Sequence, residues 1–267
     1  MKPRTTVTWL RDDDPFPPAS LALTPDSGMG GLLAASDDIS DARLEAAYRH
    51  GVFPWYSHGQ PVLWWSPDPR MVLRLDRFHA GHSLRKKVRQ LARDPRWSFG
   101  FDGDFGAVIA ACASSDRPGQ DGTWITDEVI DAYRRLHVRG LAHSFELRHD
   151  GALIGGGYGV AIGRMFYGES MFTRQTDASK VALSTLAAFL QHHGFDMIDC
   201  QQNTRHLASF GAREESRAHF LADVDARLAL AGLDHWPSHW PLALPDEAGG
   251  QAPSTARRRV VTPSSRA

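Results

Sequence analysis

Apolar residues recur with helical or strand spacing through most of the chain, but residues 1–40 follow neither pattern. This stretch is rich in Pro, Asp, Ser and Gly, which favours short elements on the surface. A helix is expected over residues 41–50, because Ser40 can cap its start and Gly51 can end it. A short strand is expected over residues 72–75, which read VLRL.

The second part of the chain alternates between strand and helix spacing. Residues 143–172 alternate with period two and turn at Asp150-Gly151 and at Gly163, which predicts three consecutive antiparallel strands. Another strand is expected over residues 195–201. Helical spacing predicts further helices over residues 82–93, 105–114, 127–139, 177–192, 206–210 and 216–230. Thr126 is the expected cap of the helix over residues 127–139.

This order of elements predicts an α/β (α+β) protein with two domains and a tail. The pattern changes near residue 78, so we expect a small N-terminal α/β domain over residues 1–78 and a larger domain over residues 79–245. In the larger domain the order of strands and helices resembles the acetyltransferase-like (GNAT) fold. Residues 246–267 hold few apolar side chains and are expected to be disordered.

Composition narrows the class of protein. The 267 residues are 42% hydrophobic, enough to fill a globular core, and no apolar run approaches the roughly 18 residues of a membrane span. Residues 1–18 lack the apolar segment of a secretory signal. Two cysteines, Cys112 and Cys200, are too few for a disulfide framework. We therefore expect a cytoplasmic protein.

Charge is balanced overall but uneven locally. The net charge of −1 gives no sign of a general nucleic-acid-binding surface. Residues 85–96, however, hold six basic residues against one acidic residue. The expected helix places four of them on a face beside its apolar stripe: Arg85, Lys86, Arg89 and Arg93. That face is either a site for nucleic-acid phosphates or a solvated helix surface.

The strand over residues 195–201 carries the first candidate chemistry. Period two puts Met197, Asp199 and Gln201 on one face, and an unpaired polar group in a dry site costs about 1–3 kcal/mol. Glu169, at the end of the third hairpin strand, can converge on the same cleft. Two carboxylates would suit a cationic substrate group such as an ammonium. The alternative is a satisfied hydrogen-bond pair at the strand end.

Several common sites are missing from the sequence. There is no phosphate-binding P-loop, and GGGYGVAIG at residues 155–163 lacks the spacing of a dinucleotide-binding loop. No Cys and His set has zinc spacing, so we expect no metal. Residues 173–180, TRQTDASK, contain no glycine, whereas GNAT enzymes hold acetyl-CoA on a Gly-rich loop there. We therefore expect another acyl donor and no cofactor.

Six motifs point to one family. They are FPWYSHGQPVLWWSPDPR, TWIT, HSFEL, FYGESMF, ASK and IDCQ. In order and spacing they resemble the leucyl/phenylalanyl-tRNA–protein transferases, and the similarity runs from about Gly31 to Leu221. The sequence departs from the family pattern at residues 36–40, SDDIS, and at residues 155–157, GGG, where many members carry a bulkier residue.

The resemblance implies a bacterial cytoplasmic enzyme with a small N-terminal domain beside a GNAT-like domain, and with no metal, cofactor or membrane. The enzyme would take Leu or Phe, with Met as a further candidate, from aminoacyl-tRNA. It would add that residue to the N-terminal Arg or Lys of an acceptor protein and so mark the acceptor for degradation.

The resemblance also implies roles for single residues. The catalytic groups would be Asp199, Gln201 and Glu169. The aminoacyl-adenosine end would lie against Trp55 and Trp124. The pocket for the Leu or Phe side chain would involve Phe166, Met171, Leu183 and Ile198, with Gly157 leaving it roomier. The tRNA backbone would lie on Arg85, Lys86, Arg89 and Arg93. The other rings of residues 51–70, namely Phe53, Trp64 and Trp65, would pack the small domain onto the large one.

The implied reaction is aminolysis of an ester, and it fits these residues. The nucleophile is an α-amine with a pKa of about 7.7–8.0, so the enzyme needs positioning and charge stabilisation more than a strong base. Asp199 would be the electrostatic partner or base, and Gln201 the group in direct contact. Glu169 would hold the donor's α-ammonium, its ribose or the acceptor's basic side chain.

Three other functions stay open from the residues alone. Two are acyltransferases: one would use a CoA thioester, and the other would use aminoacyl-tRNA to extend a cell-wall peptide. The third is a non-catalytic RNA-binding module, in which the aromatic rings stack on unpaired bases. An acidic cleft would hinder such a module, which favours an enzyme.

Overall fold

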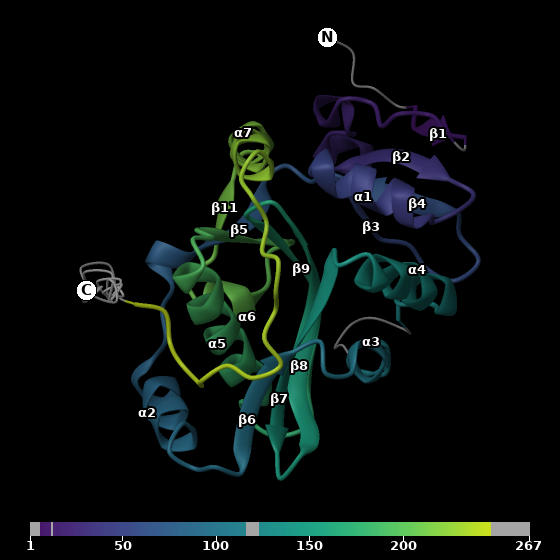
Figure 1. Ribbon diagram of the computed structural model, residues 1–267. Helices are drawn as coiled ribbons and strands as arrows, with labels where there is room; N and C mark the ends of the chain where they lie inside the picture. The colour runs from purple at the N-terminus through teal and green to yellow at the C-terminus, as the bar shows by residue number, and fades with distance from the viewer. Residues whose placement is uncertain (1–5, 12, 116–122, 247–267) are drawn as a thin grey trace, which may run out of the picture.

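The computed structural model describes residues 6–11, 13–115 and 123–246, and in it the chain forms two β-sheets flanked by helices (Figure 1). The first sheet has four strands in the order β1-β2-β4-β3. Their bounds are β1 (Thr8–Leu10), β2 (Leu32–Ser36), β3 (Phe53–Pro54) and β4 (Val62–Trp65). The second sheet has seven strands in the order β11-β5-β10-β9-β8-β7-β6. The mixed α/β class predicted from the sequence is confirmed.

The seven-stranded sheet is built around the predicted double hairpin. Its strands are β5 (Arg70–Arg74), β6 (Trp97–Phe101), β7 (Ala142–His149), β8 (Ala152–Ile162), β9 (Met165–Thr173), β10 (Met197–Gln201) and β11 (Arg213–Glu215). The turn between β7 and β8 has φ of 48° at Asp150 and 77° at Gly151, the left-handed pair that a tight hairpin turn needs. Strand β10 runs parallel to β9 and antiparallel to β5, so its carboxyl end lies between the start of β5 and the middle of β9.

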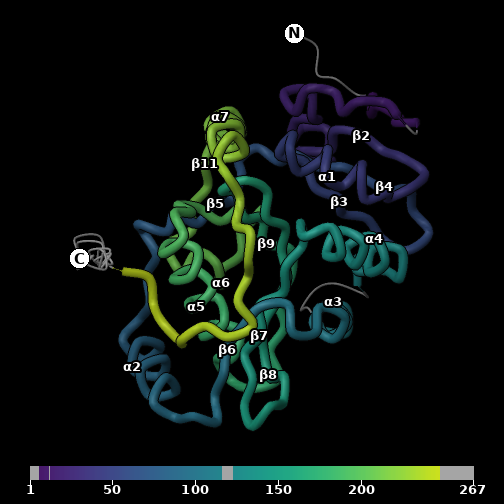
Figure 2. Tube along the Cα trace, viewed as in Figure 1, coloured from purple at the N-terminus to yellow at the C-terminus, as the bar shows by residue number. Residues whose placement is uncertain are grey.

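Helices cover both faces of the large sheet (Figure 2). They are α1 (Asp41–Arg49), α2 (His82–Leu91), α3 (Phe105–Ala113), α4 (Asp127–Val138), α5 (Ala178–His192), α6 (Arg205–Ala208) and α7 (Arg217–Leu228). Single 3-10 turns are η1 (Ala19–Leu21), η2 (Pro25–Ser27) and η3 (Leu75–Arg77). Helices α3 and α4 pack on one face with α1 and α7, whereas α5 packs on the other face with α2 beside it.

The predicted helix caps are present. The Ser40 hydroxyl accepts a hydrogen bond from the Arg43 N–H at the start of α1, and the Thr126 hydroxyl accepts one from the Val129 N–H at the start of α4. Each cap satisfies a backbone donor that the first helical turn leaves without a partner. Helix α1 holds Tyr48 and α4 holds Tyr133, and both side chains are fully buried against the large sheet. The two caps thus help to fix two tyrosines that support Glu169 through hydrogen bonds, as described below.

The three rings expected to pack the small domain onto the large one differ in their contacts. The Trp64 indole N–H donates to the Ser36 hydroxyl at 2.9 Å and its ring packs edge-on against Phe16, both in the N-terminal part of the chain. The neighbouring ring, Trp65, is only partly buried and lies against Trp55. Of the three rings, Phe53 does reach the large sheet, where it lies over the Arg70 guanidinium.

The chain passes from the first sheet to the second across residues 66–69, because β5 already pairs with β10 and β11. The change of sequence pattern near residue 78 therefore lies one strand later than the change of sheet. The division into two domains stays a prediction. Among the described residues, none of the helices combines the length and the apolar character needed to cross a membrane.

Candidate active site

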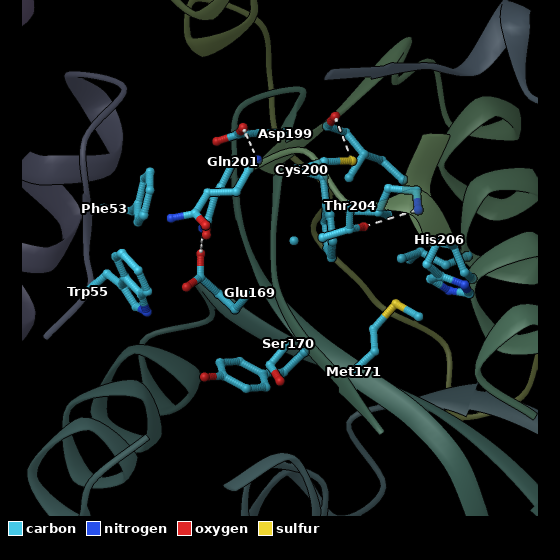
Figure 3. Close-up of a pocket in the computed structure, with 18 of the residues that line it drawn as sticks. Phe53, Trp55, Glu169, Ser170, Met171, Asp199, Cys200, Gln201, Thr204 and His206 are labelled. Atoms are coloured by element: carbon cyan, nitrogen blue, oxygen red, sulfur yellow. Dashed lines mark hydrogen bonds between the residues drawn. The ribbon is translucent and has the colours of Figure 1, made fainter. Parts of the chain in front are cut away.

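A cavity of about 290 Å³ opens where β9, β10 and the segment after β3 meet. Its walls bring together most of the residues singled out in the sequence: Trp55, Trp124, Phe166, Glu169, Met171, Leu183, Ile198, Asp199 and Gln201. Figure 3 shows Phe53 and Trp55 on one side of Glu169 and Gln201, and Met171 and His206 on the other. The cavity therefore has an aromatic end, a polar centre and an apolar end.

The polar centre rests on a buried ion pair. The Arg70 guanidinium donates to both carboxylate oxygens of Asp199, from Nε to Oδ1 at 2.8 Å and from Nη2 to Oδ2 at 2.6 Å. Neither side chain is more than 1% exposed. Arg70 also donates to the Gly51 carbonyl oxygen. Because a bidentate Arg–carboxylate pair fixes both groups in direction, Asp199 has little freedom to turn toward a substrate.

Two aromatic rings enclose this guanidinium. Its carbon lies 4.7 Å from the centre of the Phe53 ring and 4.5 Å from that of Phe220. Phe53 belongs to β3 and Phe220 to α7, so the cation joins both to strands β5 and β10. The rings exclude water from the ion pair and so strengthen the attraction between its two charges. They also make the loss of either partner more costly, because the remaining charge would be buried alone.

The backbone conformation of Gln201 sets the direction of its N–H group and its side chain. Its φ of 61° lies in the left-handed region, where a residue other than glycine is strained, and the pairing of β10 with β5 is irregular at this point. This conformation lets the Gln201 N–H donate to Asp199 Oδ1 at 2.9 Å. The side-chain amide then donates from Nε2 to Glu169 Oε1 at 2.8 Å (Figure 3). The two hydrogen bonds of Gln201 thus connect Asp199 to Glu169.

Glu169 receives a second hydrogen bond from a pair of buried tyrosines. The Tyr133 hydroxyl donates to Glu169 Oε2 at 2.9 Å, and the Tyr48 hydroxyl is hydrogen-bonded to that of Tyr133. Burial raises the pKa of both tyrosines well above its usual value, so both keep their protons. Burial also raises the pKa of Glu169 to about 7, although the hydrogen bonds from the tyrosines lower it. Glu169 can therefore take up or release a proton near neutral pH.

The apolar end is lined by the predicted side-chain pocket and by residues that the sequence did not indicate. Phe166, Leu183 and Ile198 are nearly fully buried there, and Met171 is partly exposed. Further wall residues are Phe145, Leu186 and Leu207. Gly157 lies behind this wall, since a Cβ atom on it would come within 2.8 Å of both Phe145 and Met171. A side chain at Gly157 would thus displace the wall itself.

The predicted basic face lies on α2 and just after its end, away from the cavity walls. Lys86, Arg89 and Arg93 are exposed. Arg85 is partly buried and donates from Nε to the Ala80 carbonyl oxygen, so it is tied to its own helix start. The three exposed side chains can therefore meet a large partner, but they do not reach the small cavity.

Among the described residues, one group has the geometry to hold a metal ion: Glu215, His219 and Asp223. The Arg74 guanidinium already pairs with both of its carboxylates. That cation fills the place between the acids, so the group fits an ion-pair network better than a metal centre.

The chain matches the sequence models and several members of one protein family. The sequence model described as leucyl/phenylalanyl-tRNA protein transferase matches residues 72–225, and the model of its N-terminal domain matches residues 37–68. Relatives that carry this name include the protein of Cupriavidus necator, 57% identical over 230 residues that cover 86% of this chain and 92% of the relative. The protein of Burkholderia vietnamiensis is 53% identical over 253 residues, covering 94% of this chain and all of the relative.

The chain is thus an enzyme of the aminoacyltransferase class. It belongs to the leucyl/phenylalanyl-tRNA protein transferase family. Among solved structures, FemX has a TM-score of 0.45 at 12% identity and covers 69% of this chain and 70% of its own.

The ion pair leads to a prediction for stability. Arg70→Met should lower the free energy of unfolding by about 3–5 kcal/mol, because Asp199 is left charged and buried without its partner. The double variant Arg70→Met/Asp199→Leu should recover part of that loss, since it buries no charge. Urea unfolding of the three proteins measures both effects. Equal losses in the single and double variants would show that the buried charge is not the cause.

Glu169 leads to a prediction for the pH dependence of stability. Its pKa is about 7 in the folded protein and near 4.5 when unfolded, so the folded state binds the proton more tightly. The stability that this group contributes is therefore present below pH 4.5 and is lost as the pH rises through 7. Relative to wild type, Glu169→Gln should gain on the order of 1–3 kcal/mol between pH 5 and pH 8 in urea unfolding. A constant difference across that range would contradict the raised pKa.

Proposed function

We propose that the protein transfers Leu or Phe, with Met as a further candidate, from aminoacyl-tRNA to the N-terminal Arg or Lys of acceptor proteins. The observation that carries this proposal is the cavity, in which an apolar end adjoins a hydrogen-bonded Glu169–Gln201 pair. The apolar end suits a Leu or Phe side chain, and a carboxylate beside it suits an amine acceptor. Family membership supports the same reaction and disfavours the CoA-dependent and RNA-binding alternatives.

Glu169 is the proton acceptor in the proposed mechanism. The α-amine of the acceptor attacks the ester carbonyl carbon, the bond to the ribose oxygen breaks, and the tRNA leaves with its hydroxyl restored. A proton moves from the amine to Glu169 and then to the leaving oxygen. A carboxyl with a pKa of about 7 is matched to an amine with a pKa of about 7.7–8.0, as efficient general acid–base catalysis requires.

Asp199 is the electrostatic partner rather than the base. Its two oxygens accept from Arg70 and from the Gln201 N–H, and its side chain is fully buried. Gln201 transmits this charge to the reacting centre and, once substrate is bound, can donate its amide hydrogen to the carbonyl oxygen as negative charge develops there. Trp55 and Trp124, at the aromatic end, are suited to hold the terminal adenosine.

The wider arrangement follows from the same proposal. A GNAT-like catalytic domain with a small N-terminal domain fits the large mixed sheet and the four-stranded sheet beside it. The exposed basic face of α2 would bind tRNA phosphates, and the enzyme would act in the cytoplasm, where charged tRNA and nascent proteins are both present.

The proposed reaction has a direct test. Incubation with Phe-tRNA or Leu-tRNA and a peptide that begins with Arg should add one residue to the peptide, as mass spectrometry would show. A matched peptide with an acetylated N-terminus should remain unchanged, because its nitrogen is no longer nucleophilic. An unmodified Arg peptide, in a reaction where the tRNA stays charged, would contradict the proposed function.

The role of Glu169 predicts a change in the pH–rate profile. Glu169→Gln should lower the rate of transfer by about 10²–10⁴-fold, the usual worth of a general base. Tyr133→Phe should move the acidic limb of the profile to higher pH, because a lost hydrogen bond to the carboxylate raises its pKa further.

The matched control for Tyr133→Phe is Tyr167→Phe. Tyr167 is equally buried, but its hydroxyl donates to the Tyr48 carbonyl oxygen and not to Glu169. This variant should lose stability without moving the acidic limb. The same shift in both variants would mean that the tyrosines act only through packing.

The basic face predicts a selective loss of tRNA binding. Replacing Lys86, Arg89 and Arg93 by Ala should raise the apparent KM for charged tRNA. It should also flatten the dependence of binding on salt, by about 0.9 in logarithmic slope for each phosphate that the protein no longer neutralises. Transfer from a short aminoacyl-adenosine donor should not change, because such a donor cannot reach α2. An equal loss with both donors would assign the face a structural role.

A further inference from the structure

A second cavity, of about 630 Å³, adjoins the aromatic end of the proposed active site. The two cavities share Trp55 and Trp124, so these rings form the wall between them. Most of the other lining residues come from the segments around β2, β3 and β4, and Thr123 precedes α4. They are Met29, Tyr56, Ser57, His58, Gln60, Leu63, Trp65 and Thr123. We call this space the outer groove.

The outer groove is aromatic, and the described residues that line it include no Lys, Arg, Asp or Glu. An acceptor that begins with Arg or Lys would find no carboxylate on those residues, whereas the inner cavity offers Glu169. A third cavity, on the far side of Met171 and His206, is lined instead by hydroxyl groups and by Arg174. Of these two neighbouring spaces, the outer groove is therefore the one suited to stacking on flat, uncharged rings.

The rings of the outer groove are held in place before any ligand binds. Trp65 lies in β4, where it pairs with Phe53 and Leu32. Its indole N–H donates to the Trp55 carbonyl oxygen at 2.7 Å. The two indoles meet edge to face, with centres 5.7 Å apart. A ring that is already ordered loses little conformational entropy on binding, so it makes an efficient stacking surface.

We propose that the outer groove binds the base of the unpaired nucleotide that precedes the terminal adenosine of the donor tRNA. The proposal rests on the proposed function, which puts the aminoacyl-adenosine in the inner cavity. The preceding nucleotide then lies outside that cavity, beyond Trp55, and its base stacks on the side of Trp65. Trp55 is thus the partition between two successive nucleotides of one strand.

Three short donors test this inference in single-turnover transfer to an Arg peptide. They are Phe-adenosine, Phe-esterified cytidylyl-adenosine, and the same dinucleotide with an abasic first residue. The cytidine should raise kcat/KM over that of Phe-adenosine by about tenfold, the usual worth of one stacked base. The abasic donor should show little of this gain, because the gain comes from the base and not from the phosphate.

Two variants test whether the gain in kcat/KM from the cytidine depends on the outer groove. Trp65→Leu should reduce the ratio of the dinucleotide rate to the adenosine rate to about one. Trp9→Leu is the matched control, since Trp9 is a half-exposed tryptophan of the same sheet that lies outside the outer groove. It should leave the ratio unchanged. Thermal unfolding of both variants shows whether each is folded, and the ratio does not depend on a general loss of activity.

The outcomes separate this inference from the proposed function. No transfer from any of the donors would overturn the proposed function itself. Transfer from Phe-adenosine without a gain from the cytidine, or with an equal gain from the abasic donor, would overturn the stacking site alone. A full gain that persists in Trp65→Leu would also overturn it, because the base would then bind elsewhere.

Discussion

The buried pair of Arg70 and Asp199 is the interaction on which the site depends. It joins two residues that are 129 positions apart in the chain, on strands β5 and β10. The same guanidinium also contacts the Phe53 and Phe220 rings and the Gly51 carbonyl. A charge that is taken out of water needs its partner in place, so the first sheet, the large sheet and α7 must come together correctly for the site to form. The site is therefore complete only where the fold has brought these three parts together.

Because of this ion pair, the two carboxylates of the cavity have different environments and different proposed roles. Asp199 is fully paired and held, and it orients Gln201 through the backbone N–H. Glu169 accepts from neutral groups, the Gln201 amide and the Tyr133 hydroxyl, and burial raises its pKa to about 7. Two acids in one cavity thus have different environments and suit different roles, one as a fixed charge and the other as a proton acceptor.

Local patterns predicted the elements well but not the partners of the buried polar groups. Period two and the Asp150-Gly151 turn were enough to predict β7 to β9, and Ser40 and Thr126 were enough to predict two helix starts, because these signals act within a few residues. The motifs also indicated residues that do line one cavity. Arg70, Tyr48 and Tyr133 were missed, since pairing across the fold leaves no trace in spacing.

In the proposed mechanism the acceptor amine meets Glu169 and Gln201, while Asp199 stays paired with Arg70. A crystal structure with a non-reactive amide analogue of Phe-adenosine and an Arg peptide tests this arrangement. The acceptor nitrogen should lie within hydrogen-bond distance of the Glu169 carboxylate, with the Arg70–Asp199 pair intact. An acceptor nitrogen bound to Asp199, with Arg70 displaced, would contradict it.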